Sequence, residues 1–190
     1  MGRIVATEFV SLDGVMEAPG GDEGFKHKAW TFAFDRGEEG NKFKLDEVFE
    51  AEVQLLGRRT YEGFAAAWPS REDEFGFSER MNTMPKYVFS NTLEQADWEN
   101  TTILSGDFAT EIAKLRDEID GVALVAGSAQ LVQALIEHDL IDELRLMVFP
   151  VLLGSGKRLF GDLDDKRTLR LTDSKAVGGD GVLVLTYEPA

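Results

Sequence analysis

Two short turns in this chain have the residue types that bind anions. The first follows a buried apolar run, Val122 to Ala126, and precedes a helix predicted from about Ala129 to Glu137. The first N–H groups of a helix have no partner within the helix, and the helix dipole adds partial positive charge there. The candidate ligands for a diphosphate are Ala126, Gly127, Ser128, Ala129 and Gln130. A plain strand-to-helix connection has the same pattern, so that alternative stays open.

The second turn follows a short apolar strand, Val53 to Gly57, and opens a helix with Arg58, Arg59 and Thr60. Guanidinium groups bind phosphate in a bidentate manner, so this turn, like the first one, is predicted to bind an anion. The alternative is that the two arginines only form ion pairs with nearby carboxylates at the surface. The functional hypothesis requires that both turns lie side by side and that no side chains fill the gap between them.

Three other segments carry polar residues at places where strands or loops end. Asp13 and Gly14 follow the predicted strand 3–10, and Ser90 and Asn91 close the predicted strand 86–90. The carboxyl edge of an open α/β sheet is where ligands bind, but these residues also suit turns. Lys157 and Arg158 lie in a segment rich in proline and glycine, where they either hold a substrate phosphate or face solvent in a turn.

Composition excludes several classes of function. The 190 residues carry a formal net charge of −15, which opposes binding to nucleic acid and to anionic membranes. Cysteine is absent and there are only two histidines, so we expect no metal site of the usual kinds. No apolar run is long enough to span a bilayer and no signal peptide is recognisable, so we expect a cytoplasmic protein.

The order of predicted elements indicates the fold class. Strands and helices alternate through residue 149, and a β-hairpin about residues 178–181 follows. A helix is predicted from Lys42 to Ala51, the segment 68–85 is predicted to be irregular, and Asp107 is the predicted N-cap of a later helix. This order predicts an α/β protein with a mostly parallel central sheet, flanking helices and an antiparallel C-terminal edge, formed by a single domain over 1–190. The long segment from Glu17 to Asn41 is either a lid, a satellite packing cluster or a subunit contact. The strand 144–149 fits either the core or a subunit interface.

Several motifs together resemble a known superfamily. LLGRRTYEGF, residues 55–64, is similar to the strand-to-helix segment of dihydrofolate reductases. VAGSAQLVQALIEHDLIDELRLMVFPVLLGSGKRLF, residues 125–160, and SLDGVMEAPGG, residues 11–21, resemble the reductase domain of bifunctional riboflavin-biosynthesis enzymes, the RibD C-terminal domain. The resemblance runs from about Ile4 to Tyr187 and rests on these ordered motifs.

The resemblance implies a dihydrofolate reductase-like fold that binds NADPH and forms homodimers. It implies that Gly57, Arg58, Arg59 and Thr60 lie along the cofactor phosphates, that Ser90 and Asn91 meet the adenosine ribose phosphate, and that residues 126–130 cradle the pyrophosphate. Ala126 replaces a glycine that is common in that turn. The carboxylate that anchors the pterin in dihydrofolate reductases matches Asn41 here, which cannot act as an acid, so folate reduction is disfavoured.

We therefore expect an NADPH-dependent reductase of a small heterocyclic or ribosylaminopyrimidine-like substrate. Asp13 is the candidate proton donor or substrate anchor; the donor role requires burial to raise its pKa toward neutrality. Gly14, Asn41, Lys157 and Arg158 are the other candidate substrate residues. Because the chain lacks the residues of a zinc deaminase, the bifunctional activity is not expected. The competing hypothesis is a non-catalytic NADPH- or nucleotide-binding dimer.

Overall fold

The computed structural model describes residues 1–22 and 24–190, and Glu23 lies outside the described residues. The strands are β1 (Arg3–Ser11), β2 (Ala51–Gly57), β3 (Lys86–Phe89), β4 (Thr101–Leu104), β5 (Val122–Ala126), β6 (Glu143–Phe149), β7 (Leu169–Val177) and β8 (Val182–Pro189). The helices are the short 3₁₀ segment η1 (Trp30–Ala33), then α1 (Gly37–Glu50), α2 (Arg58–Ala67), α3 (Phe77–Thr83), α4 (Phe108–Glu118) and α5 (Ala129–Glu137).

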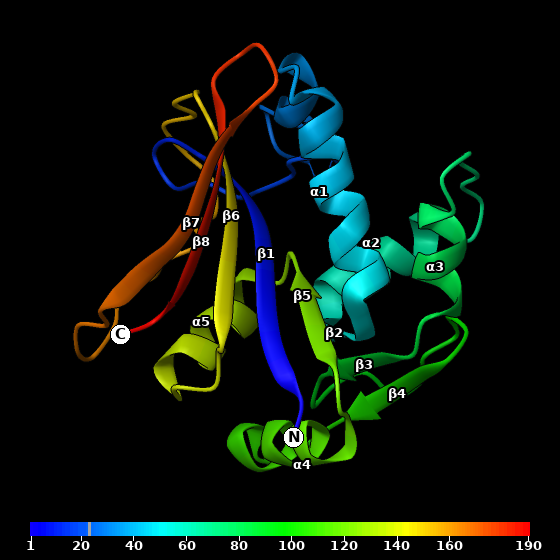
Figure 1. Ribbon diagram of the computed structural model, residues 1–190. Coiled ribbons are helices and arrows are strands. Elements are labelled where there is room, and N and C mark those ends of the chain that lie inside the picture. Colours follow the sequence, from blue (N-terminus) through cyan, green and yellow to red (C-terminus); the bar gives the residue numbers. More distant parts are fainter. Residues whose placement is uncertain (23) are drawn as a thin grey trace.

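All eight strands join one sheet in the order β4-β3-β2-β5-β1-β6-β8-β7 (Figure 1). The pairs from β4 through β6 are parallel, whereas β8 pairs antiparallel with both β6 and β7. The predicted fold class, a mostly parallel sheet with an antiparallel C-terminal hairpin, is therefore confirmed. Because β6 lies between β1 and β8 and is largely buried, the strand 144–149 belongs to the core.

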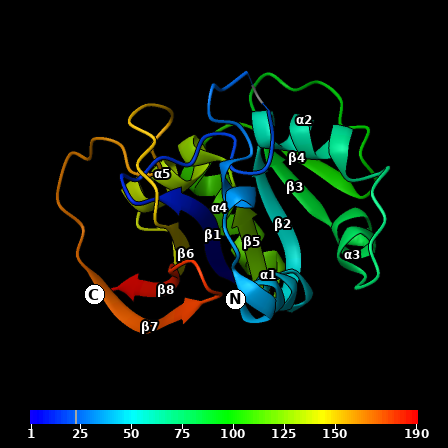
Figure 2. The ribbon, with the colours of Figure 1, turned by 90° about the horizontal axis from the view of Figure 1, so that it is seen from above.

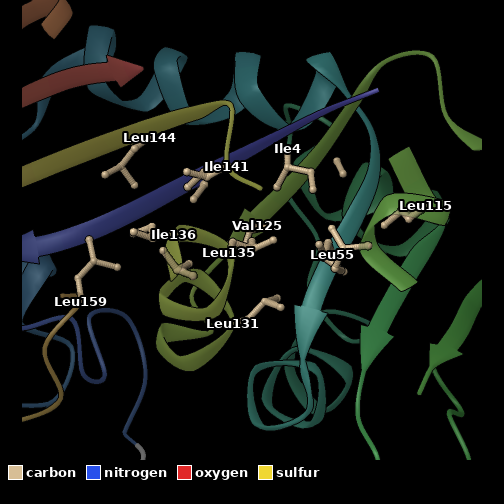
Figure 3. Packing of buried hydrophobic residues seen from close by; sticks show 14 of the residues in the cluster. Ile4, Leu55, Leu115, Val125, Leu131, Leu135, Ile136, Ile141, Leu144 and Leu159 are labelled. Carbon is tan, nitrogen blue, oxygen red and sulfur yellow. The ribbon is translucent and has the colours of Figure 1, made fainter. Parts of the chain in front are cut away.

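Helices cover the sheet on both faces because successive strand side chains point to opposite sides. On one face Ile4 and Ala6 of β1 and Leu55 of β2 pack in the cluster that contains α4 and α5 (Figure 3). On the other face Val5 and Leu56 pack with residues from α1, α2 and α3. Thus β2 leads into a helix on one face, while its neighbour β5 leads into α5 on the opposite face.

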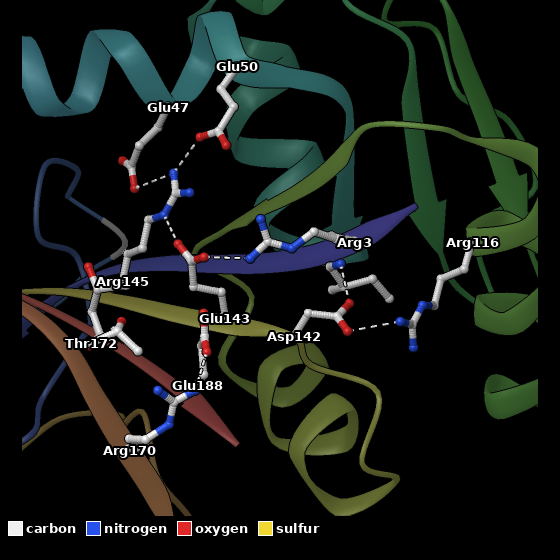
Figure 4. Close-up of polar contacts among 12 residues, drawn as sticks. Arg3, Glu47, Glu50, Arg116, Asp142, Glu143, Arg145, Arg170, Thr172 and Glu188 are labelled. Carbon is white, nitrogen blue, oxygen red and sulfur yellow. Dashed lines mark hydrogen bonds and ion pairs between the residues drawn. The ribbon is translucent and has the colours of Figure 1, made fainter. Parts of the chain in front are cut away.

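Ion pairs tie the far end of α1 to the middle of the sheet (Figure 4). The guanidinium of Arg145 on β6 contacts Glu143 and lies 2.8 Å from Glu50 on α1, and Arg3 on β1 lies 2.6 Å from Glu143. Burial alone would raise the pKa of Glu143, but the hydrogen bonds from both arginines lower it below its ordinary value. The network fixes α1 against β1 and β6.

The long segment before α1 packs against the hairpin side of the sheet. Trp30 and Phe34 meet the ring of Phe149 edge-on, with ring centroids 5.4 and 5.7 Å apart, and Trp30 is buried. Their packing agrees with the satellite-cluster interpretation of this segment. Phe32, in contrast, is 76% exposed.

Two helices differ from the sequence prediction. The helix predicted from Lys42 begins at Gly37, because Gly40 packs closely against Arg36 and Val177 of the hairpin. The region 68–85, predicted to be irregular, contains α3, whose first N–H groups are bound by the carboxylate of Asp73. Asp107 caps α4 as predicted, because its side chain accepts a hydrogen bond from the N–H of Thr110.

Candidate functional site

The candidate site lies where the parallel strands end. β3, β2 and β5 are neighbours in the sheet, so the predicted cofactor segments that follow them lie along one edge; Figure 2 views the molecule from above, onto this edge. The connections after β2 and β5 leave toward opposite faces of the sheet. In α/β proteins such a point, where neighbouring strands diverge to opposite faces, is the usual place for ligand binding.

The turns after β2 and β5 contact each other directly. The N–H of Gly57 donates to Oγ of Ser128 at 2.9 Å, and the N–H of Ser128 donates to Oγ1 of Thr60 at 2.9 Å. These two hydrogen bonds form a reciprocal link between the turns. The turns therefore lie side by side, as the hypothesis requires, but the side chains of Ser128 and Thr60 fill the gap between them, contrary to its second condition. A ligand that uses both turns has to lie along their outer rim.

The helices that start at this rim have open N-termini. Among the described residues, the N-cap residues of α2 and α5, Gly57 and Ser128, make no side-chain capping hydrogen bond to their own helix, and neither helix has an acidic residue in its first turn. In contrast, α1 begins with Glu38 and Glu39, and α4 has both an Asp107 cap and Glu111. Ser128 has a left-handed backbone, with φ of 62°, which is uncommon for a side chain other than glycine. In a chain this acidic, two adjoining open helix ends form a local anion-attracting region.

The two arginines at the start of α2 differ in their surroundings. Arg58 forms an ion pair with Glu62 one turn along the helix, at 2.9 Å. For Arg58, this agrees with the alternative that the arginines pair with surface carboxylates. Arg59 is exposed, and within the described part of the chain no ion pair is recorded for it. Arg59 is therefore the guanidinium more available to a ligand.

Ser90 and Asn91 are engaged within their own connections. Oγ of Ser90 accepts hydrogen bonds from the N–H groups of Thr92 and Leu93, and Oδ1 of Asn91 accepts one from Gly106 at 2.7 Å. These contacts match the turn-capping alternative, although both residues do lie beside Gly57 at the same edge, because Phe89 pairs with Gly57.

Asp13 ties together two loops at the neighbouring end of β1. Its carboxylate accepts hydrogen bonds from Oγ of Ser11 and from the N–H groups of Leu153 and Gly154, at 2.5, 3.1 and 2.8 Å. The Ser11 hydroxyl, followed by these N–H groups, lowers the pKa of Asp13 to about 2. The proton-donor role required burial to raise the pKa of Asp13, and this condition is not met, because the hydrogen bonds lower the pKa. The substrate-anchor role of Asp13 stays a prediction.

The candidate substrate residues gather only in part. The guanidinium of Arg158 donates a hydrogen bond to the main-chain oxygen of Asp13, and the N–H of Leu159 donates one to the main-chain oxygen of Gly14. Gly14 therefore lies in a loop next to the loop that contains Lys157 and Arg158. Asn41 lies on α1, where it accepts a hydrogen bond from Arg36 at 2.6 Å. No contact between Asn41 and the other three is recorded among residues 1–22 and 24–190.

Sequence reasoning missed a set of buried polar groups on β1 and α1. Glu8, only 3% exposed, accepts a hydrogen bond from the N–H of Gly127 at 3.1 Å. On the opposite face of β1, Thr7 donates to Glu47 at 2.9 Å, and Lys44 lies 2.6 Å from the same carboxylate. An acidic residue in the middle of an otherwise apolar and β-branched strand was the available signal.

Comparison with known proteins agrees with this architecture. The model of the family described as RibD C-terminal domain matches residues 3–183. The chain belongs to this family. The predicted membership in the RibD branch of the dihydrofolate reductase-like superfamily is therefore confirmed, and the fold is of the reductase type.

The relatives and structures similar to this chain extend over nearly its whole length. The uncharacterised protein YwjB of Bacillus subtilis is 31% identical over 89% of this chain and 88% of its own. A putative riboflavin biosynthesis protein from Shewanella shares 21% identity and a TM-score of 0.79, covering 99% of each chain. The dihydrofolate reductase of Enterococcus faecalis, solved with NADP(H), has a TM-score of 0.59 at 17% identity, covering 98% of this chain and 96% of its own.

No helix within the described residues has both the length and the apolar character needed to span a membrane.

Proposed function

We propose that this protein is an NADPH-dependent reductase that acts on a small heterocyclic or ribosylaminopyrimidine-like substrate. The observation that carries the proposal is the pair of adjoining open helix N-termini at the point where β2 and β5 diverge. The rim offers the first N–H groups of α2 and α5 and the guanidinium of Arg59, and the first turn of each helix lacks acidic residues. This donor set suits a diphosphate and an additional phosphate.

Seven of the candidate residues have distinct tasks in this proposal. Ala129 and Gln130 at the start of α5 bind the diphosphate through main-chain N–H groups, and Arg59 binds the phosphate that distinguishes NADPH from NADH. Ser128 and Thr60 hold the two turns in register. Lys157 and Arg158 lie beside the Asp13 loop, where they can bind an anionic group of the substrate. When bound, the dihydronicotinamide supplies the hydride.

The test is a comparison of cofactor affinity in variants. We expect Arg59→Ala to weaken NADPH binding by about tenfold or more while leaving NADH nearly unchanged, because a charge-assisted bond is worth about 1.5–3 kcal/mol. Arg170→Ala is the matched control, because Arg170 is an exposed arginine on the far hairpin, 2.8 Å from Glu188. Equal NADPH affinity of Arg59→Ala and wild type in fluorescence titrations would refute the phosphate assignment.

One observation favours a second candidate, a protein that binds NADPH or another nucleotide without catalysis. The expected proton donor, Asp13, has a pKa of about 2 and is therefore ionised at neutral pH. A screen of NADPH oxidation against pterins, ribosylaminopyrimidines, quinones and small carbonyls separates the candidates. Turnover with any of these supports the reductase, whereas tight NADPH binding without turnover supports the second candidate.

We also propose that the protein is a cytoplasmic homodimer, as the family resemblance suggests. The exposed apolar side chains of Leu12 and Leu152 support a subunit contact, because the N–H of Leu12 bonds to the oxygen of Val151 and so places the two loops side by side. Sedimentation equilibrium checks this proposal, and a monomer at micromolar concentration would contradict it.

A further inference from the structure

Glu8 is the one charged side chain of β1 that enters the core beneath α5. Its neighbours two residues away on the same face, Ala6 and Val10, are buried in the apolar cluster that contains Leu131 and Leu135 of α5. A carboxyl group in such surroundings costs free energy unless its oxygens are hydrogen-bonded. The presence of Glu8 in this core therefore calls for a local explanation.

Only one oxygen of Glu8 has a hydrogen-bond partner within residues 1–22 and 24–190. Oε2 accepts a hydrogen bond from the N–H of Gly127, whereas Oε1 is buried and has no hydrogen-bond partner among the described residues. Gly127 has φ of 69° and the next residue, Ser128, has φ of 62°, so two successive left-handed residues turn this N–H inward toward β1. The carboxyl group of Glu8 thus lies directly under the turn that begins α5.

Opposing effects act on the pKa of Glu8. Burial raises its pKa well above the ordinary value; the positive charge of Lys44 and the N–H of Gly127 lower it, and the negative charge of Glu47 raises it. Lys44 and Glu47 lie on α1, across the sheet, and the β5–α5 turn contributes N–H groups rather than charged side chains. The net direction is toward the neutral acid.

An anion on the rim of α5 would compete with ionised Glu8 for the same positive region. The helix dipole and the N–H groups at the start of α5 can stabilise one negative charge well, but two negative charges there repel each other. The ligand phosphate and the Glu8 carboxylate approach this helix end from opposite sides, outside and inside. Occupation of the rim therefore favours the protonated form of Glu8.

We propose that Glu8 couples binding of the anionic cofactor to uptake of a proton, as a positioning residue under the α5 turn that is neutral when a diphosphate is bound. The inference deepens the proposed function and depends on it for the identity of the ligand, NADPH. Affinity falls as pH rises above the range in which Glu8 is neutral in the free protein, because binding then requires a proton from solution. The slope reaches at most about tenfold per pH unit for one proton.

The first measurement needs no ligand. We compare thermal stability of wild type and Glu8→Gln between pH 4 and 9, with Glu72→Gln as the control at an exposed glutamate. A raised folded-state pKa means that the native protein binds more protons than the unfolded chain above about pH 4.3, so wild-type stability falls relative to Glu8→Gln as pH rises. A difference between the two proteins that is constant with pH overturns the proposal.

The second measurement counts protons on binding. Calorimetric titrations of NADPH in two buffers of different ionisation enthalpy, from pH 6 to 9, give the number of protons taken up. Titration of the ligand phosphate is common to both proteins, so the difference between wild type and Glu8→Gln reports Glu8 alone. We expect wild type to take up as much as one proton more than Glu8→Gln, and Glu8→Gln to lose the matching part of its pH dependence.

The outcomes separate the two proposals. Equal proton uptake in wild type and Glu8→Gln overturns the role of Glu8 even if NADPH binds. If NADPH does not bind, the proposed function fails, and the same titration with inorganic pyrophosphate tests the role of Glu8. Greater proton uptake by wild type than by Glu8→Gln supports that role. Binding without this extra uptake, or no binding of pyrophosphate, overturns it. If Glu8→Gln does not fold, a titration of the Glu8 carboxyl carbon by NMR in wild type, with and without ligand, gives the same answer.

Discussion

Asp13 is held in a different state from the one that its position in the sequence suggested. A carboxyl group at the end of a central strand is a natural candidate for proton transfer, but three hydrogen-bond donors converge on it from Ser11 and from residues 153 and 154. Donors favour the charged form of an acid. At the scale of single residues, the Ser11 hydroxyl and contacts with a distant loop lower the pKa of Asp13, and the contacts with the loop are not visible in the local sequence.

The pH dependence of stability tests this state of Asp13. Its folded-state pKa of about 2 lies below the ordinary value of about 3.9, so the ionised carboxylate stabilises the fold above about pH 4, and this contribution is lost as pH falls toward 2. We expect Asp13→Ala to have a lower melting temperature than wild type at pH 7, and the difference to shrink between pH 4 and pH 2.

The control for that experiment is Asp117→Ala, which removes an exposed carboxylate on α4. Its melting temperature should follow that of wild type across the same range. A deficit of Asp13→Ala that is as large at pH 2 as at pH 7 would show that the carboxylate charge is not what holds the loops.

At the scale of elements, the two turns that meet at the rim illustrate what local sequence can predict. Each turn combines a strand, a glycine and a helix, and the start of α5 at Ala129 and of α2 at Arg58 follows from that pattern. The link between Ser128 and Thr60 was not predictable, because it depends on β2 and β5 being neighbours in the sheet. The same holds for Glu8, whose contact with Gly127 follows from the register of β1 against β5.

The elements that were predicted poorly share a cause. Helix α3 has few apolar residues, and its first turn is held by Asp73 from outside the helix, so it lacks the periodic pattern by which helices are recognised. The first turn of α1 contains Gly37 and Gly40, which are poor helix formers, but contact with the β7–β8 hairpin stabilises it. In both cases tertiary contacts outweigh local preference.

The link between the turns can be tested through Ser128. We expect Ser128→Ala to lower stability by about 1 kcal/mol, because the N–H of Gly57 loses its acceptor. Ser128→Gly loses the same acceptor, but glycine relieves the left-handed backbone by about 1 kcal/mol, so its stability should be close to that of wild type. Both variants should bind NADPH several-fold more weakly, as measured by fluorescence titration.

The comparison of the two Ser128 variants separates affinity from stability. If the register of the turns matters for the ligand, affinity decreases in both variants although only one is less stable. Wild-type affinity in Ser128→Gly would contradict a role for the link in binding.

At the scale of the whole molecule, the charge of −15 opposes an anionic cofactor while the rim attracts it. At about 10 mM salt the screening length is about 30 Å and the whole protein repels the ligand; at about 150 mM it is about 8 Å and mainly the rim acts. We therefore expect the association rate of NADPH in stopped-flow experiments to increase between these salt concentrations. A rate that decreases with salt would mean that the arginines, rather than the net charge, control the approach.

The central place of β1 has a consequence for how the chain is made in the cell. The strand is synthesised before both of its partners, β5 and β6, yet it pairs with them, with Arg3 opposite Val122 and Val5 opposite Glu143. Its apolar side chains therefore stay uncovered until synthesis has passed Phe149. Since a ribosome adds about 5–20 residues per second, this exposure lasts for several seconds or more, and a chaperone that covers β1 during translation would protect it from aggregation.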